Sequence, residues 1–327
     1  MNTAPTFTSN PPPNGTMNVF YSHFFAVSGN PASTYTYSGN LPPGLSLSSS
    51  GHLSGTPKEA GNFQMTVTAS NGVPPDATQT FTLLILPTES NLNYQGMWWN
   101  SNESGWGMTV NQHGNMIFVA IYSYDPSGQP IWYVISNCPL FATSCTGDIY
   151  RVTGGTAPTL PWNGLNKAVI PVGKGTLTFT DASKGVFNYT IDELNGSKSI
   201  TKMIFAAGTT SPPVDYTDLW WNANESGWGV SLTHQYGMIF ASWYTYDNNG
   251  KPIWYVASSC PMVENGCTGT LYQVNGGTPF TSAWDGSKKV VSEIGMVNFI
   301  FTSPSTAIMS YFIGDILGAR AITRQPF

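Results

Sequence analysis

Glu103 and its counterpart Glu225 are the residues whose surroundings most resemble a catalytic site. Each lies inside an unusual ten-residue segment, Trp-Trp-Asn-Ser-Asn-Glu-Ser-Gly-Trp-Gly at 98–107, which returns at 220–229 with nine of ten residues identical. A carboxyl group close to indole rings can stay protonated and act as a general acid. Hydrolysis of a glycoside usually needs a second carboxylate at a defined separation. Asp125 is also repeated, but its Asp-Pro-Ser-Gly context predicts a β-turn.

A structural role explains the same glutamate without catalysis. A partly buried carboxylate can accept hydrogen bonds from the Ser-Gly-Trp backbone that follows it. It can also pair with a repeated cation, and the two matched candidates are Lys198/Arg320 and Lys202/Arg324. We expect the structural role and keep a hydrolase centred on Glu103/Glu225 as an alternative.

The histidines and serines add no catalytic constellation. His113 aligns with Gln235 in the other repeat, and His234 aligns with Gln112. A catalytic or metal-binding histidine in a duplicated site should recur in register, so a Ser-His-Asp arrangement is not supported. Ser104 follows a glutamate and lacks the G-x-S-x-G elbow of serine hydrolases. We therefore predict no catalytic residue, no metal site and no cofactor.

Aromatic residues are the remaining candidates for ligand contact. Indole rings stack on the apolar faces of sugars, although they also fill cores because of their bulk. On a strand, the adjacent Trp98 and Trp99 must point to opposite sides. One should therefore lie inside and the other outside or at an opening, where it and Asn100 are the best ligand contacts. The candidate ligand-binding residues are Trp98, Trp99, Asn100, Glu103, Trp106, Trp220, Trp221, Asn222, Glu225, Trp228 and Trp243.

Trp243 is a special case among these candidates, because Ile121 occupies its position in the first repeat. This difference would allow the second repeat to bind differently.

Four cysteines lie at matched positions with C-x6-C spacing. They are Cys138, Cys145, Cys260 and Cys267. Zinc usually takes closer pairs and two further ligands, so we predict one disulfide in each repeat, worth roughly 2–3 kcal/mol. Disulfides indicate the periplasm, the cell surface or the exterior. Residues 1–5 lack the features of a signal peptide, and we expect a native one to have been removed.

The composition restricts the partners. Only 9% of the 327 residues are charged, against roughly 25% in an average soluble protein. The net charge is −5 without a basic run, which argues against nucleic acid. No apolar stretch reaches the roughly 18 residues of a transmembrane helix, so we expect no membrane insertion. An extracellular glycan or a surface protein is the expected partner.

The duplication predicts the architecture of the last two-thirds of the chain. A constant offset of 122 residues relates Tyr94–Phe205 to Tyr216–Phe327. Each copy contains about eight short strands separated by turns and essentially no helix. Such a meander can close into an up-and-down barrel. The strand at 116–124 is apolar or aromatic on both faces. The predicted domains are 1–88, 94–205 and 216–327, joined by linkers at 87–93 and 206–214.

The first domain carries a sequence signature of its own. It contains L-P-P-G-L-S-L at 41–47, G-H-L-S-G-T-P at 51–57 and an alternating strand at 61–72. This series resembles the bacterial immunoglobulin-like, cadherin-like modules, which implies a seven-stranded β-sandwich that acts as a spacer or presenter. The resemblance does not extend to calcium, because Glu59 and Asp76 are the only acidic residues in the domain. The two copies that follow are similar to the W-W-N-x-x-E-S-G-W-G repeats of uncharacterised secreted bacterial proteins.

These observations favour an all-β, secreted or cell-surface binding protein without catalytic activity that recognises extracellular carbohydrate. The alternatives are a structural or adhesion subunit that binds other proteins, a barrel that holds a small apolar ligand, and the hydrolase described above.

Overall fold

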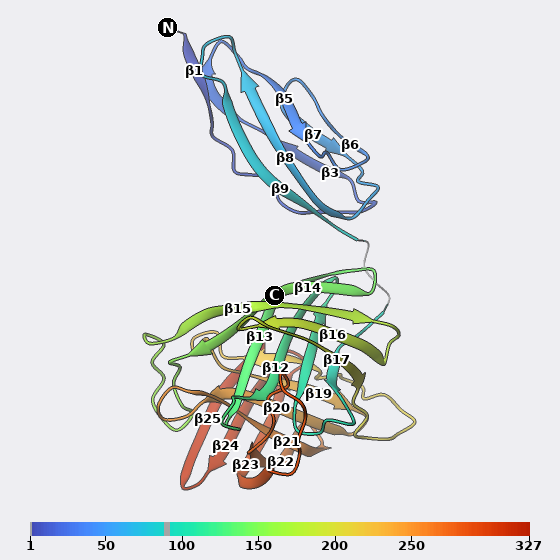
Figure 1. Cartoon of the computed structure of the whole chain (residues 1–327), viewed down its shortest axis with the longest axis vertical. Helices are drawn as coiled ribbons and strands as arrows, with labels where there is room; N and C mark the ends of the chain where they lie inside the picture. Colours follow the sequence, from blue (N-terminus) through green and yellow to red (C-terminus); the bar gives the residue numbers. More distant parts are fainter. Residues whose placement is uncertain (1, 88–91) are drawn as a thin grey trace. The chain divides into compact units, whose positions relative to one another are not determined.

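The computed structural model describes residues 2–87 and 92–327, and every regular element in them is a strand (Figure 1). The part of the first predicted linker at 88–91, and residue 1 of the first predicted domain, lie outside this range. The chain divides into two compact units, the N-terminal module and the pair of repeats. In the described segments, no helix is long and apolar enough to cross a membrane.

The N-terminal module is a β-sandwich of short strands. Its strands are β1 (Thr3–Phe7), β2 (Gly15–Thr16), β3 (Tyr21–Phe24), β4 (Val27–Asn30), β5 (Thr34–Gly39), β6 (Leu45–Leu47), β7 (His52–Gly55), β8 (Gly61–Ser70) and β9 (Ala77–Leu86). They form the sheets β2-β9-β8-β5, β3-β7-β6 and β1-β4. Met65, Val67 and Ala69 alternate into the core with Leu83 and Ile85. The resemblance implies seven strands. The structure divides the module into nine, and several of them are only two to four residues long.

Each repeat closes into an eight-stranded barrel of sequential antiparallel hairpins. The first barrel consists of β10 (Gly96–Trp99), β11 (Gly107–His113), β12 (Met116–Tyr124), β13 (Pro130–Phe141), β14 (Ser144–Thr153), β15 (Ala168–Phe179), β16 (Lys184–Ile191) and β17 (Leu194–Lys202). The second consists of β18 (Asp218–Trp221), β19 (Gly229–Gln235), β20 (Met238–Tyr246), β21 (Pro252–Val263), β22 (Gly266–Asn275), β23 (Val290–Ser303), β24 (Thr306–Ile313) and β25 (Ile316–Arg324). The predicted fold class is confirmed.

The closing pairs are equivalent in the two barrels. Trp98 of β10 pairs with Lys202 of β17, and Trp220 of β18 pairs with Arg324 of β25. Closure removes the free edges that would otherwise invite pairing with another chain. The repeated Trp-Trp motif is therefore the element at which each barrel closes.

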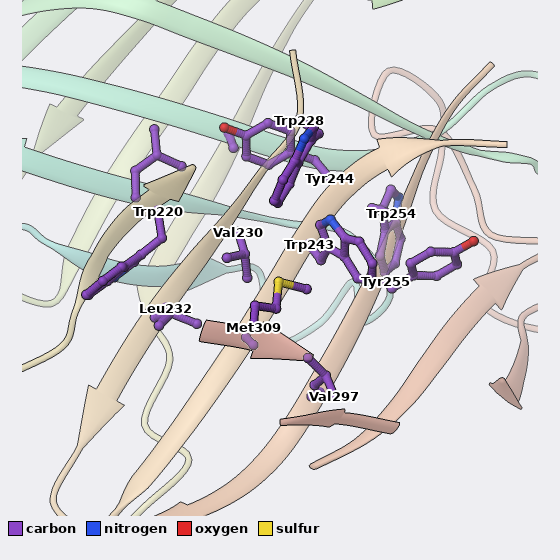
Figure 2. Packing of buried hydrophobic residues seen from close by; sticks show 14 of the residues in the cluster. Trp220, Trp228, Val230, Leu232, Trp243, Tyr244, Trp254, Tyr255, Val297 and Met309 are labelled. Carbon is purple, nitrogen blue, oxygen red and sulfur yellow. The ribbon is translucent and has the colours of Figure 1, made fainter. Parts of the chain in front are cut away.

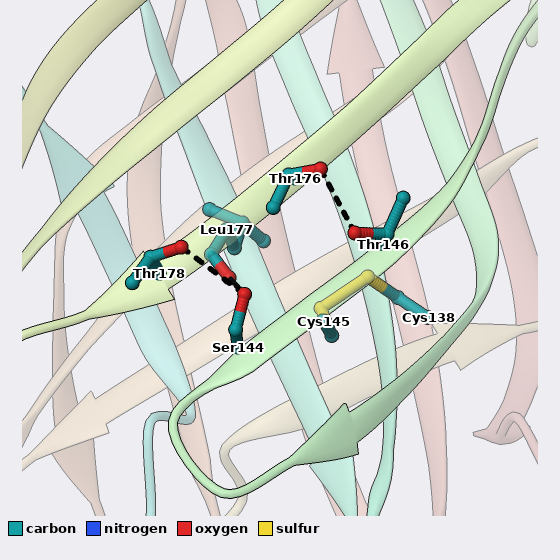
Figure 3. The surroundings of a disulfide bond; sticks show 7 residues. All are labelled: Cys138, Ser144, Cys145, Thr146, Thr176, Leu177 and Thr178. Carbon is teal, nitrogen blue, oxygen red and sulfur yellow. Dashed lines mark hydrogen bonds between the residues drawn. A yellow bond between two sulfur atoms is a disulfide. The ribbon is translucent and has the colours of Figure 1, made fainter. Parts of the chain in front are cut away.

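The disulfides also form as predicted, Cys138 with Cys145 and Cys260 with Cys267. Cys138 follows a bulge in β13, which has one residue more than β12 between the pairs Val119–Ile135 and Ile117–Cys138. The bond ties β13 to β14 beside this irregularity. On β14 and β15, Thr146 and Thr176 share a hydrogen bond of 2.8 Å (Figure 3), so that hydroxyl groups satisfy one another on the surface of the barrel.

The two barrels pack against each other through strands that are apolar on both faces. In β12, Ile117, Val119 and Ile121 alternate with residues that join the core of the second barrel. Those residues are Phe118, Ala120, Tyr122 and Tyr124. In Figure 1, β12 and β13 lie beside β19 and β20. One face of the strand thus fills its own barrel and the other packs on the second barrel.

The contacts across this seam are reciprocal. Thr109 bonds to its own equivalent, Ser231, at 2.9 Å. The Trp132 indole donates to the carbonyl of Thr245 at 2.8 Å. The indole of its equivalent, Trp254, donates to the carbonyl of Ser123 at 2.9 Å. Such pairs define a pseudo-two-fold arrangement of the isologous kind.

A long loop from each barrel covers the opening of the other. We call these loops, at 154–166 between β14 and β15 and at 276–288 between β22 and β23, the plug loops. The Tyr189 hydroxyl of the first barrel donates to the carbonyl of Phe280 at 2.9 Å, and Tyr311 of the second donates to that of Pro158 at 2.7 Å. Gly155 lies so close to the ring of Tyr246 that any side chain there would collide with it. The opening of each barrel is therefore closed by a loop that belongs to the other barrel.

The two plugged openings are filled in different ways. In the first barrel, the Phe280 ring packs against Trp106, Tyr133 and Tyr189 at 4.7–6.2 Å between ring centres.

In the second barrel, the equivalents Trp228, Tyr255 and Tyr311 surround Trp243 instead, at 4.9–6.3 Å between ring centres. Figure 2 shows Trp228 and Tyr255 beside Trp243. The large Trp243 thus accompanies the small plug residue Pro158, and the small Ile121 accompanies the large plug residue Phe280. The large residue is therefore on the strand in the second barrel and on the plug loop in the first.

This exchange predicts a compensating pair of substitutions. Trp243→Ile should lower the free energy of unfolding by roughly 2–4 kcal/mol because it leaves a cavity. Adding Pro158→Phe should recover a substantial part of that loss, since it recreates the arrangement of the first barrel. Urea unfolding of the full chain measures both variants. Strictly additive losses in the double variant would show that the two residues do not share one space.

Candidate functional site: the seam of the barrel pair

The paired tryptophans of each motif point to opposite sides of the closing strand. Trp98 is 0% exposed and its indole donates to the carbonyl of Tyr94 at 2.7 Å. Trp99 is partly exposed and lines a groove outside the barrel. Trp220 and Trp221 repeat this arrangement, with Trp221 lining the equivalent groove.

The asparagine after each pair holds a turn. The Asn100 side-chain oxygen accepts from the backbone N–H of Asn102 at 3.0 Å, and Asn222 does the same for Asn224 at 2.9 Å. Neither Asn100 nor Asn222 is among the residues that line the grooves. These asparagines therefore stabilise the turn that precedes each glutamate.

The glutamates anchor the motif to the last strands of the barrels. Glu103 pairs with Lys198 of β17 at 2.7 Å and accepts from the Trp106 indole at 3.0 Å. Glu225 pairs with Arg320 of β25 at 2.9 Å. Of the two cations weighed from the sequence, the partner is Lys198/Arg320. Glu225 borders a cavity of only about 10 Å³ beneath the plug loop, which is about the space of one water molecule.

Two equivalent grooves run along the seam, with open volumes of about 180 and 150 Å³. Both barrels contribute to each groove. The first is lined by Met97, Trp99, Ser104, Gly105, Trp106, Gly107, Tyr122, Met203, Phe240, Ser242, Trp254, Val256 and Val274. The second is lined by Phe118, Trp132, Val134, Val152, Trp221, Ser226, Gly227, Trp228, Tyr244 and Gln325. Every residue of the second has its 122-residue equivalent in the first.

Several polar groups in the grooves already have partners within the protein. The Trp254 indole N–H is donated to Ser123, and the Ser104 hydroxyl accepts from Lys289 at 2.9 Å. The remaining lining is dominated by methionine, valine and aromatic side chains. The grooves therefore suit a ligand that presents an apolar face.

The other tryptophan candidates are almost fully buried. Trp106, Trp228 and Trp243 are at most 7% exposed, and Trp243 fills the second barrel. Among residues 2–87 and 92–327, no group of three His, Cys, Asp or Glu side chains is placed to hold a metal ion.

Two solvent-facing tryptophans were not among the sequence-selected candidates. Trp162 is 40% exposed and its equivalent Trp284 is 43% exposed, each on a plug loop. Their recurrence at the 122-residue offset was visible in the sequence. The lack of alternating hydrophobicity around them was the available indication that they lie in loops.

Comparison with known proteins adds support for the first module. The family described as Putative Ig domain matches residues 4–86, in agreement with the immunoglobulin-like module predicted above. No curated protein matches the chain. An immunoglobulin-like module followed by barrels is consistent with a surface or adhesion protein, and the two disulfides fit an extracellular location.

Among solved structures, the similarities are remote. A quinoprotein alcohol dehydrogenase-like protein from Bacteroides thetaiotaomicron is 10% identical with a TM-score of 0.21, and 98% of each chain is covered. The four N-terminal Ig domains of Dscam1 isoform 9.44 are 11% identical with a TM-score of 0.25, again over 98% of each chain. Similarity at this level carries no argument about fold or function.

Buried tyrosines at the seam predict sensitivity to alkali. Burial raises the pKa of Tyr122 to about 12 from its ordinary value of 10.0. Its neutral form is therefore favoured in the folded state, and this stabilisation is fully present below pH 10 and is lost as the pH rises toward 12. A shift of this size corresponds to about 3 kcal/mol.

We expect the urea midpoint of the barrel pair to fall between pH 9 and pH 11.5, and to fall less in Tyr122→Phe. The ultraviolet difference spectrum between the two proteins should show no tyrosinate signal from Tyr122 until unfolding. A signal that titrates near pH 10 in the folded protein would contradict the burial of this hydroxyl.

Proposed function

We propose that this chain is a non-catalytic protein that binds carbohydrate outside the cytoplasm, with the barrel pair as its binding body. The observation that carries the proposal is the exposure of four indoles in two matched pairs. Trp99 and Trp221 open onto the seam grooves, and Trp162 and Trp284 face solvent from the plug loops. Each offers an apolar ring next to water, as stacking on a sugar requires.

The arrangement of the glutamates supports a binding role over hydrolysis. Both carboxylates are paired with a cation on the last strand of their barrel, Lys198 of β17 or Arg320 of β25. The cavity beside Glu225 is too small for a glycoside.

A small apolar ligand in the seam grooves is the second candidate function. It is favoured by the methionine, valine and aromatic lining and by the polar groups whose hydrogen bonds are already made. The interior of a barrel is a poorer location, because Trp98, Trp220 and Trp243 fill it.

The proposal predicts that the full chain binds members of an array of neutral glycans. A variant with Ala at Trp99, Trp221, Trp162 and Trp284 should lose this binding while keeping its thermal unfolding transition. Phe312→Ala is the control, since Phe312 is an exposed ring of similar size on the outer face of β24, and it should bind as the wild type does.

Failure of the wild-type chain to bind any glycan would refute the carbohydrate proposal. Uptake of the neutral apolar dye Nile red, abolished by Trp99→Ala with Trp221→Ala, would instead select the second candidate.

A further inference from the structure

The loop at 154–166 presents the Trp162 indole in a fixed orientation. The ring lies over Gly164, where an added Cβ would come within 2.6 Å of its Cζ2 atom. The Thr156 hydroxyl donates to the carbonyl of Asn163 at 2.7 Å and accepts from its N–H at 2.9 Å. The loop therefore loses little freedom when a ligand covers the exposed face of the ring.

A hollow of about 780 Å³ lies beside this ring. Its volume is in the range of ligand sites, roughly 300–1,000 Å³. The polar side chains that line it are neutral, four asparagines and one threonine. The asparagines are Asn163, Asn166, Asn248 and Asn249.

Much of the hydrogen-bonding capacity of these amides is open to solvent. The Asn248 side-chain oxygen accepts from the Thr159 hydroxyl at 2.8 Å, which fixes this amide and leaves its NH₂ group available. Asn166 and Asn249 are exposed, and their side chains make no hydrogen bond to the part of the chain that the structure describes. An amide both donates and accepts, as a sugar hydroxyl does.

The matched loop of the second barrel provides an internal comparison. Trp284 lies over Gly286 in the same way, and Thr278 makes the same pair of backbone contacts. The flanking residues differ, however. The positions of Asn163, Asn166, Asn248 and Asn249 are occupied by Asp285, Lys288, Pro126 and Ser127. Two of the four amides are thus replaced by charged side chains, Asp285 and Lys288.

We propose that the Trp162 hollow is the principal carbohydrate site of the chain and takes a neutral sugar, which stacks on the indole and bonds to the flanking amides. The Trp284 loop shares the aromatic platform without the amides, and does not form such a site. This inference rests on the proposed function and narrows it from four exposed indoles to one site in each chain.

The test uses the full chain and a panel of neutral oligosaccharides, namely cellohexaose, maltohexaose, chitohexaose and mannohexaose, in isothermal titration calorimetry. For an oligosaccharide that binds, we expect one site per chain. Trp162→Ala should weaken binding roughly 30-fold or more, as truncation of a central aromatic contact does. Trp284→Ala should leave it unchanged.

Asn166→Lys introduces the residue of the other copy and keeps the indole. It should weaken binding as well, so that the test does not depend on the loss of a ring alone. Thermal unfolding of each variant confirms its fold.

Equal losses from Trp162→Ala and Trp284→Ala, or binding that survives both and is lost in Trp99→Ala with Trp221→Ala, would overturn the inference and leave the carbohydrate function standing. Absence of binding by the wild type, both to the panel and to the glycan array, would overturn the function and the inference together.

Discussion

The contact on which the rest of the structure depends is the packing of β11–β13 on β19–β21. A small closed barrel needs apolar side chains only inside, yet β12 and β20 are apolar on both faces. The Trp132 ring packs against Tyr244 and Tyr246 of the other barrel, at 4.9 and 5.6 Å between ring centres. Its equivalent Trp254 packs against Tyr122 and Tyr124. Exposure of such a face to water would carry a large hydrophobic cost, and the duplicated barrel is the partner that removes it.

Two properties of the molecule follow from this packing. The seam of two convex barrels leaves a groove on either side of the pseudo-two-fold axis, and the outward tryptophan of each closing strand lines that groove. The loops beside the seam reach the opposite barrel and close it. The repeated motif thus contributes to folding through Trp98 and Glu103, and to a solvent-facing surface through Trp99.

The copies have nevertheless diverged at positions that leave the scaffold unchanged. The opening of the second barrel holds Trp243 and Pro158, and that of the first holds Ile121 and Phe280, so that a large residue accompanies a small one in each. The asparagines around Trp162 have no counterparts around Trp284. Because both loops keep the same backbone contacts, this difference changes the polar groups beside the indole and leaves the loop's own hydrogen bonds in place.

Much of the fold was predictable because its determinants are local. Alternation separated Trp98 from Trp99, the cysteine spacing indicated both disulfides, and the matched cations included the partners of Glu103 and Glu225. The arrangement of the barrels was not predictable, since hydrophobic periodicity shows that both faces of 116–124 are buried without showing what covers them. The grooves and the Trp162 hollow were not predicted from the sequence for the same reason. They join residues far apart in sequence, and a repeated tryptophan in a loop has no periodic pattern to reveal its exposure.

Native-state hydrogen exchange of the full chain in increasing urea tests most directly whether the two barrels form one folding unit. If each barrel covers the other's apolar face and opening, the slowest-exchanging amides of β12 and β20 should converge on one opening free energy with the same dependence on urea. Amides of one barrel that exchange through complete unfolding while those of the other stay protected would contradict this account.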